Sequence, residues 1–154
     1  MLNIKPYKQT SGMCGPASLK MVLEYFGVEK SEKELGRLTH CNPDRGAKAE
    51  NIVEAATQLG FNGLIKDMAD FSDIKAYLNK EIPVIVDWFS KDEGHYSVVV
   101  GLDKENIYLQ NPEIGGVQEL SLKIFKRVWF DFPGVFIKSK DDLILRRIIV
   151  IQKT

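Results

Sequence analysis

Apolar residues recur at helical spacing through the first part of the chain, and short polar segments separate these stripes. Residues 17–26 hold few polar side chains, which is typical of a buried helix, and we expect this helix over about 15–26, ending at Gly27. Residues 49–59 place apolar side chains on one face, which predicts an amphipathic helix that ends at Gly60. Shorter helices are expected over 31–38, capped by Ser31, over 72–79, capped by Ser72, and over about 121–128.

The second part of the chain is richer in β-branched and aromatic residues, which favour strands. We expect strands over 61–66, 83–89, 95–102, 107–110, 135–137 and 143–151. The polar segment 103–106 is a short turn, so the strands on either side of it are expected to form an antiparallel hairpin. Arg146 and Arg147 lie within the last expected strand, which predicts an edge or half-exposed strand.

The order of these elements, helices first and strands afterwards, predicts an α+β fold of two layers. A chain of 154 residues can bury a core of its own, and we expect a single domain over 1–154. Its helical half is expected at about 1–80 and its sheet half at about 81–154. A side chain on the helical side and another on a strand can then meet in the cleft between the layers.

Composition and charge narrow the classes of function. The 44% hydrophobic and 27% charged residues are typical of a globular protein, and 21 Lys and Arg residues balance 21 Asp and Glu residues. This balance leaves no electrostatic footprint for nucleic acid. No apolar run has the length of a membrane span, and the N-terminus has no apolar signal core, so we expect no membrane insertion and a cytoplasmic location.

The cysteines and histidines indicate neither a disulfide framework nor a metal site. The chain has 2 cysteines, Cys14 and Cys41, and 2 histidines, His40 and His95. His40 and Cys41 are adjacent in sequence, and neighbouring residues rarely converge on one metal ion. We therefore expect no metal and no cofactor, and Cys41 is expected to be an ordinary buried or loop thiol.

Cys14 stands where a polar, glycine-bearing loop runs into the first apolar helix. The unpaired N–H groups and the dipole at a helix N-terminus favour an anion, and they lower the pKa of a thiol there. Cys14 is therefore a candidate nucleophile. The alternative interpretation is a small buried hydrophobic residue, which is the commonest role of a lone cysteine.

His95 and Asn111 are candidates for the groups that would assist this nucleophile. His95 opens an apolar strand, which is a rigid position for a catalytic base, and the alternative is a strand-end histidine bonded to backbone. The expected hairpin returns Asn111 beside His95, where its side-chain oxygen can accept the ring N–H and fix the tautomer. The alternative for Asn111 is the turn that Asn-Pro commonly starts.

Gln9 precedes Cys14 in the loop that leads into the first helix. Its side-chain amide could join the backbone N–H of Cys14 in an oxyanion hole, which acyl transfer through a cysteine needs. The alternative is an exposed loop glutamine without a catalytic role. With His95 and Asn111, these residues would supply every part of a cysteine peptidase or acyl-transfer enzyme.

Three segments resemble the bacteriocin-processing cysteine peptidases that act on double-glycine leaders, a family of the papain-like superfamily. They are Cys-Gly-Pro-Ala-Ser-Leu at 14–19, Gly-His-Tyr-Ser-Val-Val-Val-Gly at 94–101 and Ile-Tyr-Leu-Gln-Asn-Pro-Glu-Ile-Gly at 107–115, and the resemblance covers about 5–137. It implies a papain-like fold, with N-terminal helices packed on a C-terminal antiparallel sheet and the active site in the cleft between them. It also implies the following roles: nucleophile for Cys14, general base and acid for His95, orienter for Asn111, where the family usually has Asp, and oxyanion donor for Gln9.

Proteins of this family often form the N-terminal domain of peptide-exporting ABC transporters. The resemblance therefore implies a peptide or protein substrate and such a transporter as partner. The leading hypothesis is a cysteine peptidase that hydrolyses a peptide bond after a small residue or a double-glycine leader, through a Cys-His-Asn triad and a thioester intermediate. The alternatives are a non-catalytic peptide-binding module of the same fold and a Cys-dependent acyltransferase, as in the papain-like phytochelatin synthases.

Overall fold

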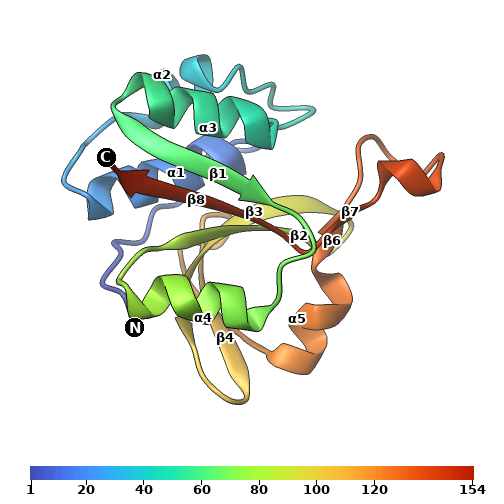
Figure 1. Cartoon of the computed structure of the whole chain (residues 1–154). Coiled ribbons are helices and arrows are strands. Elements are labelled where there is room, and N and C mark those ends of the chain that lie inside the picture. Colours follow the sequence, from blue (N-terminus) through green and yellow to red (C-terminus); the bar gives the residue numbers. More distant parts are fainter.

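A computed structural model describes residues 1–154, and Figure 1 follows the chain from its N-terminus to its C-terminus. The elements in chain order are α1 (Cys14–Tyr25), α2 (Glu32–Leu38), α3 (Ala49–Gln58), β1 (Phe61–Lys66), α4 (Phe71–Asn79), β2 (Val84–Ser90), β3 (Glu93–Leu102), β4 (Asn106–Asn111), β5 (Gly116–Ser121), α5 (Leu122–Val128), β6 (Phe130–Asp131), the 3-10 helix η1 (Lys140–Asp142), β7 (Ile144–Leu145) and β8 (Arg147–Lys153). None of the α-helices combines the length and the apolar character that crossing a bilayer would need.

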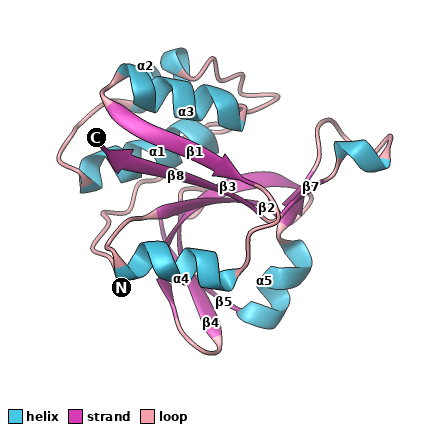
Figure 2. Cartoon of the chain, in the orientation of Figure 1, coloured by secondary structure: helices cyan, strands magenta, loops and turns pink.

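Six strands form one antiparallel sheet in the order β1-β8-β2-β3-β4-β5, and β6 and β7 form a separate short ribbon. Figure 2 shows the large sheet between two groups of helices. Helices α1, α2 and α3 share a core with one face of the sheet, whereas α4 and α5 share a core with the other face. The α+β class is confirmed, and so are the N-terminal helices packed on an antiparallel sheet.

Helix α1 is the buried helix that the apolar run predicts. Leu19, Val22 and Leu23 have no exposed surface, because α1 lies between the sheet and the other N-terminal helices. The helix ends where expected, since Gly27 adopts a φ of +90°, a left-handed conformation that glycine takes without strain. The helix begins at Cys14, one residue before the expected start.

The prediction of an edge or half-exposed strand at the C-terminus is wrong. Strand β8 pairs with β1 on one side and β2 on the other, and its Ile148–Ile151 stretch is buried. The two arginines lie at its beginning instead of its middle. Arg146 has a φ of +49°, which separates β7 from β8, and Arg147 forms an ion pair with Asp67 at 2.7 Å.

Other differences follow from local geometry. The expected strand at 135–137 is absent, because this stretch is exposed coil in the arm between β6 and β7 that projects from the body in Figure 1. The cap of α4 is Asp70 and not Ser72, since the Asp70 side chain accepts the Asp73 N–H at 3.1 Å. Strand β1 in the first half of the chain and helix α5 in the second lie where the sequence predicts them.

Candidate active site

The hairpin of β3 and β4 brings His95 and Asn111 together, as the sequence predicts. Antiparallel pairing places the first residues of β3 beside the last residues of β4. The His95 Nε2 atom lies 2.6 Å from the Asn111 Oδ1 atom. Both side chains are almost completely buried, with exposed fractions of 4% and 2%. This pair is therefore rigid and shielded from water.

The hydrogen bonds around Asn111 determine which His95 nitrogen carries the proton. The backbone N–H of Glu113 donates to Asn111 Oδ1 at 3.0 Å, so the atom at this position must be an acceptor. The other end of the amide, Nδ2, donates to Gln118 Oε1 at 2.7 Å. His95 Nε2 must then donate its hydrogen to Asn111, which leaves Nδ1 of the neutral ring free to accept a proton.

The environment of His95 favours its neutral form. Burial lowers the pKa of His95, and the hydrogen bond to Asn111 and the negative charge of Glu113 act in the opposite direction. The ring packs against Trp88 in a T-shaped arrangement, with the ring centroids 5.9 Å apart. A neutral imidazole with a free Nδ1 is the form that a general base needs before it takes a proton.

Cys14 is the first residue of α1 and is half-buried. Burial raises the pKa of its thiol to about 12, and a hydrogen bond from the backbone of Tyr96 acts in the opposite direction. The lowering expected from the helix N-terminus is therefore not seen, because burial of the charged form has the larger effect. Tyr96 follows His95 in β3, so the thiol lies beside the start of the strand that carries the candidate base.

The backbone of Gln9 lies beside the end of the β3–β4 hairpin. Its N–H donates to the carbonyl oxygen of Pro112 at 2.8 Å. Its side-chain Nε2 donates to the Thr10 carbonyl oxygen at 3.3 Å, and its Oε1 is buried without a hydrogen-bond partner. The loop is further held by Glu32, whose carboxylate accepts the Thr10 N–H at 3.0 Å.

The structure thus joins some of the candidate residues and not others. His95 and Asn111 are hydrogen-bonded, and Gln9 reaches their neighbour Pro112 by its backbone. No hydrogen bond joins the Cys14 sulfur to the His95 ring or to the Gln9 side chain. Cys41 is a free thiol whose sulfur donates to the Gly12 carbonyl oxygen at 3.5 Å, in keeping with a loop cysteine.

Sequence reasoning missed a pair of carboxyl groups close to these residues. Asp87 in β2 is 2% exposed and lies opposite Tyr96 in the pairing of β2 with β3. Burial and a hydrogen bond to Asp131 raise the pKa of Asp87 well above its ordinary value. A Cβ atom at Gly94 would overlap the Asp131 carboxylate, so the glycine before His95 is needed for this close approach. The only sign of Asp87 in the sequence is that a charged residue interrupts the apolar run of β2.

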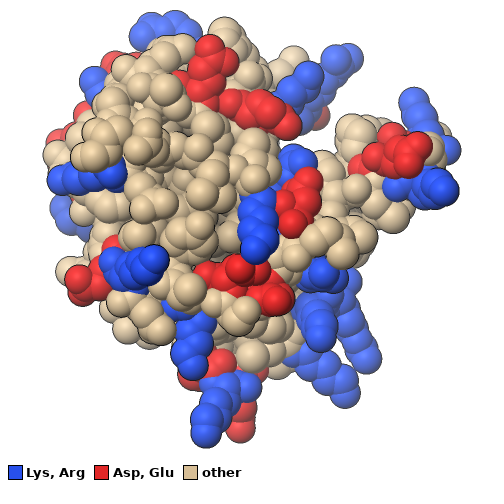
Figure 3. Space-filling model, in the orientation of Figure 1, with Lys and Arg blue, Asp and Glu red and all other residues tan.

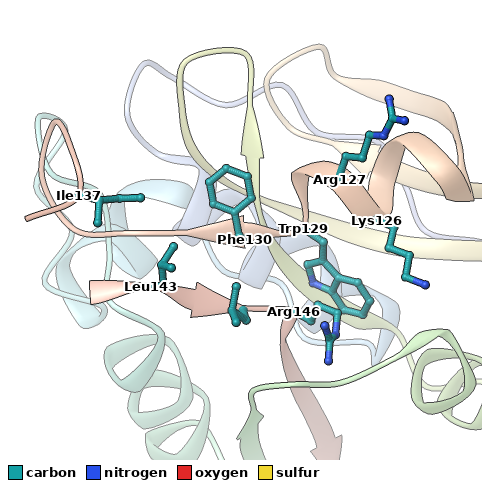
Figure 4. Close-up of a pocket in the computed structure, with 8 residues that line it drawn as sticks. Lys126, Arg127, Trp129, Phe130, Ile137, Leu143 and Arg146 are labelled. Atoms are coloured by element: carbon teal, nitrogen blue, oxygen red, sulfur yellow. The ribbon is translucent and has the colours of Figure 1, made fainter. Parts of the chain in front are cut away.

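A surface pocket of about 390 Å³ lies elsewhere, at the base of the projecting arm. Figure 4 shows that side chains from α5, β6, β7 and the arm line it, among them Trp129, Ile137 and Leu143. None of the candidate catalytic residues contributes to this pocket. The face in Figure 3 carries interspersed basic and acidic side chains, in agreement with the equal numbers of both in the sequence.

Comparison with known proteins gives a consistent result. The model of the Peptidase C39 family matches residues 4–140. An uncharacterized protein of Methanothermobacter thermautotrophicus is 30% identical over 118 residues, which are 75% of either chain. The transport/processing ATP-binding protein ComA of Streptococcus pneumoniae is 30% identical over 125 residues, but these are 75% of this chain and only 16% of ComA.

Solved structures extend the comparison to nearly the whole fold. The peptidase domain of Streptococcus ComA, a bi-functional ABC transporter, is 26% identical and superposes with a TM-score of 0.79, over 99% of this chain and all of that domain. A double glycine motif protease from an AMS/PCAT transporter has the same fold, with a TM-score of 0.73 at 20% identity, over 99% of this chain and 94% of that one. The chain therefore belongs to the Peptidase C39 family.

Proposed function

We propose that the chain is a single-domain cysteine peptidase in which Cys14 is the nucleophile and His95 is the general base and acid. Asn111 orients His95, and Gln9 helps to stabilise the oxyanion. The observation that carries the proposal is the buried His95–Asn111 pair, whose hydrogen bonds leave Nδ1 free at the strand start that the Cys14 thiol contacts. A histidine held in this tautomer, next in sequence to the residue whose backbone bonds a helix-terminal thiol, is suited to nucleophilic catalysis.

In the first half of the reaction, His95 Nδ1 takes the proton of the Cys14 thiol as the sulfur attacks the substrate carbonyl carbon. The resulting imidazolium then gives this proton to the leaving amine as the peptide bond breaks, and a thioester remains on Cys14. In the second half, His95 takes a proton from water while the oxygen attacks the thioester. The acid product leaves, and the imidazolium returns the proton to the sulfur.

The oxyanion of each tetrahedral intermediate needs donors close to Cys14. The Cys14 backbone N–H belongs to the first turn of α1, where N–H groups have no partner within the helix. The buried end of the Gln9 amide has no partner either, and its oxygen and nitrogen exchange places when the amide turns by 180°. We propose that a bound substrate favours the orientation that points Nε2 at the oxyanion.

The relatives suggest the substrate, the cellular location and the partner of this chain. Two of them are transporter peptidases, one of which was solved with a leader peptide, so we propose a peptide substrate cleaved after a double-glycine leader motif. We also propose that the chain works in the cytoplasm and with a peptide-exporting ABC transporter. The comparison with ComA covers only the peptidase part of that much longer protein.

The test is turnover of a panel of peptides that carry Gly-Gly before the scissile bond, with matched peptides in which Ala-Ala replaces Gly-Gly. Wild type is expected to cleave the Gly-Gly set, whereas Cys14→Ala and His95→Ala are expected to lose cleavage. Intact-protein mass spectrometry should show a transient acyl group on Cys14. Retained cleavage in Cys14→Ala would exclude the mechanism, and product analysis with an added amine would reveal an acyltransferase.

A second candidate function is peptide binding without cleavage. It is favoured by the raised pKa of the Cys14 thiol and by the absence of a hydrogen bond from its sulfur to His95. Micromolar peptide binding by wild type and Cys14→Ala alike, with no acyl-enzyme in wild type, would support this alternative over the peptidase.

A further inference from the structure

The side chain of Glu113 lies at the outer edge of the His95–Asn111 pair. Its Oε2 atom is 3.9 Å from His95 Nε2, and its Oε1 atom is 3.3 Å from Lys91 Nζ. Its backbone is fixed as well, because its N–H donates to Asn111 Oδ1 at 3.0 Å and its carbonyl oxygen accepts from Lys8 Nζ. The carboxylate is therefore held beside the ring instead of moving freely in solvent.

The need for such a carboxylate follows from the chemistry of the Asn111 amide. Asn111 orients the ring and fixes its tautomer, but an amide carries no charge that could balance an imidazolium. Burial lowers the pKa of His95, so the charged ring is unfavourable without compensation. The proposed mechanism forms this imidazolium in both halves of the reaction. A carboxylate within about 4–6 Å stabilises a cationic group in this situation.

We propose that Glu113 is the electrostatic partner of the His95 imidazolium and supplies the negative charge that Asn111 lacks. The proposal rests on the proposed peptidase function. Glu113 acts through His95 and touches neither the substrate nor the reacting atoms, so it is a positioning residue. Lys91 has the opposite effect on His95. Its ammonium group pairs with the Glu113 carboxylate, and its positive charge lowers the pKa of His95.

Other charged groups near His95 are less favourably placed for this role. Glu93 acts on the ring in the same direction as Glu113, but it is exposed and forms no ion pair with the ring. The Asp131 carboxylate packs against Gly94 and is hydrogen-bonded to Asp87. Lys8 Nζ donates to the Glu113 carbonyl oxygen instead of its carboxylate, and Trp88 packs against the ring in a T-shaped arrangement. Glu113 is the carboxylate that lies within ion-pair distance of the ring, at 3.9 Å from Nε2, and it can pair with the ring when the ring is protonated.

The test measures the pKa of His95 itself, by NMR titration in a Cys14→Ser background so that the ring titrates without the thiol. Glu113→Gln keeps the backbone N–H that bonds Asn111 and removes only the charge. It is expected to lower the pKa of His95 by roughly half a unit to one unit, a shift reduced by the partial exposure of Glu113. Lys91→Met should raise the pKa of His95, because it removes the opposing charge.

Two further measurements complete the design. Glu29→Gln, which makes the same charge change in the exposed segment after α1, should leave the pKa of His95 unchanged. With Cys14 intact, Glu113→Gln should lower kcat/KM for a Gly-Gly peptide by roughly 3- to 10-fold, since one pKa unit corresponds to tenfold. Lys91→Met should not lower it. Damage to the structure would lower kcat/KM in both variants, whereas the proposal predicts opposite shifts.

An unchanged pKa of His95 in Glu113→Gln would overturn the proposal, as would shifts of the same sign in the Glu113 and Lys91 variants. The peptidase function can fail separately. If wild type neither cleaves peptides nor forms an acyl-enzyme, that function falls, and the NMR titration alone still decides whether Glu113 balances the charge of His95.

Discussion

The base side and the nucleophile side of the candidate active site differ in how far their polar groups are paired. On the base side, Asn111 Oδ1 accepts two hydrogen bonds and its Nδ2 donates a third, so the ring of His95 is fixed. On the nucleophile side, the Cys14 thiol has a raised pKa, and the Gln9 Oε1 atom is buried without a partner. The base side is almost completely buried and its polar groups are paired, whereas the nucleophile side is half-buried and leaves a buried polar atom without a partner.

This difference indicates which part of the site is already formed before a substrate binds. The base side belongs to one hairpin and its continuation into β5, so local pairing assembles it. The nucleophile side combines the loop before α1 with a strand from a distant part of the sequence. An unpaired buried polar group is costly, and a Gln9 amide turned by 180° would place Nε2 there as a donor to a substrate carbonyl oxygen. We infer that substrate binding completes the nucleophile side.

The largest expected effect comes from breaking the base side. Asn111→Ala removes the acceptor of both the His95 ring N–H and the Glu113 N–H, so the ring loses its fixed tautomer. We expect kcat/KM for a Gly-Gly peptide to fall by roughly 100- to 1000-fold, with the folded state retained by circular dichroism. Asn111→Asp keeps the acceptor and should stay within roughly tenfold of wild type. Equal losses in both variants would contradict the role of the Oδ1 acceptor.

A smaller effect is expected on the nucleophile side, because its donor is not yet oriented. Gln9→Ala should lower kcat by about 10- to 100-fold and change KM little, since the lost interaction forms mainly in the transition state. Gln9→Glu has nearly the same shape but lacks the amide donor, and it should be at least as impaired. A Gln9→Ala variant with wild-type kcat would show that Gln9 is an ordinary loop residue.

The smallest effect concerns stability, through the pair of carboxyl groups of Asp87 and Asp131 close to the site. The folded state raises the pKa of Asp87, so it binds a proton that the unfolded chain releases above about pH 4. Stability from this group is therefore complete below that pH and is lost as pH rises toward the raised pKa. Asp87→Asn removes the dependence.

The measurement is urea unfolding of wild type and Asp87→Asn at pH 5 and pH 8. The variant is expected to gain about 1 kcal/mol or more relative to wild type between these two pH values. Asp44→Asn, which changes an exposed carboxylate in the loop between α2 and α3, is the matched control and should show no such gain. An identical pH dependence in wild type and Asp87→Asn would mean that Asp87 is charged in the folded state.

Sequence patterns predicted the elements whose signal is local. The apolar run of α1, the face of α3 and the β3–β4 hairpin are all observed, and the hairpin alone was enough to place Asn111 beside His95. Features that depend on tertiary pairing were not predictable. Arginine at the start of β8 suggested an edge, but the strand joins β1 to β2, with Arg147 bonded to Asp67 outside the apolar stretch.

The environment of the site was harder to predict than its residues. The pKa of Cys14 depends on how deeply the helix end is buried, which the sequence does not specify. Strand β5 was not predicted, because Gly115 and Gly116 are typical of a loop. The hydrogen bond between Asn111 and Gln118, which lies in β5, was therefore not predicted either. Glu113 follows Asn-Pro in a turn, where a charged residue is usual, so only the folded hairpin shows its distance from His95.

The central claim is that His95 activates Cys14, and the rate of Cys14 alkylation tests it most directly. Iodoacetamide labelling at pH 7, followed by mass spectrometry, compares wild type with His95→Ala. We predict that wild type reacts at least about tenfold faster, because His95 can take the thiol proton as the sulfur attacks the reagent, whereas the thiol with its raised pKa has no base without it. Equal rates in the two proteins would contradict the account and leave Cys14 as a structural cysteine.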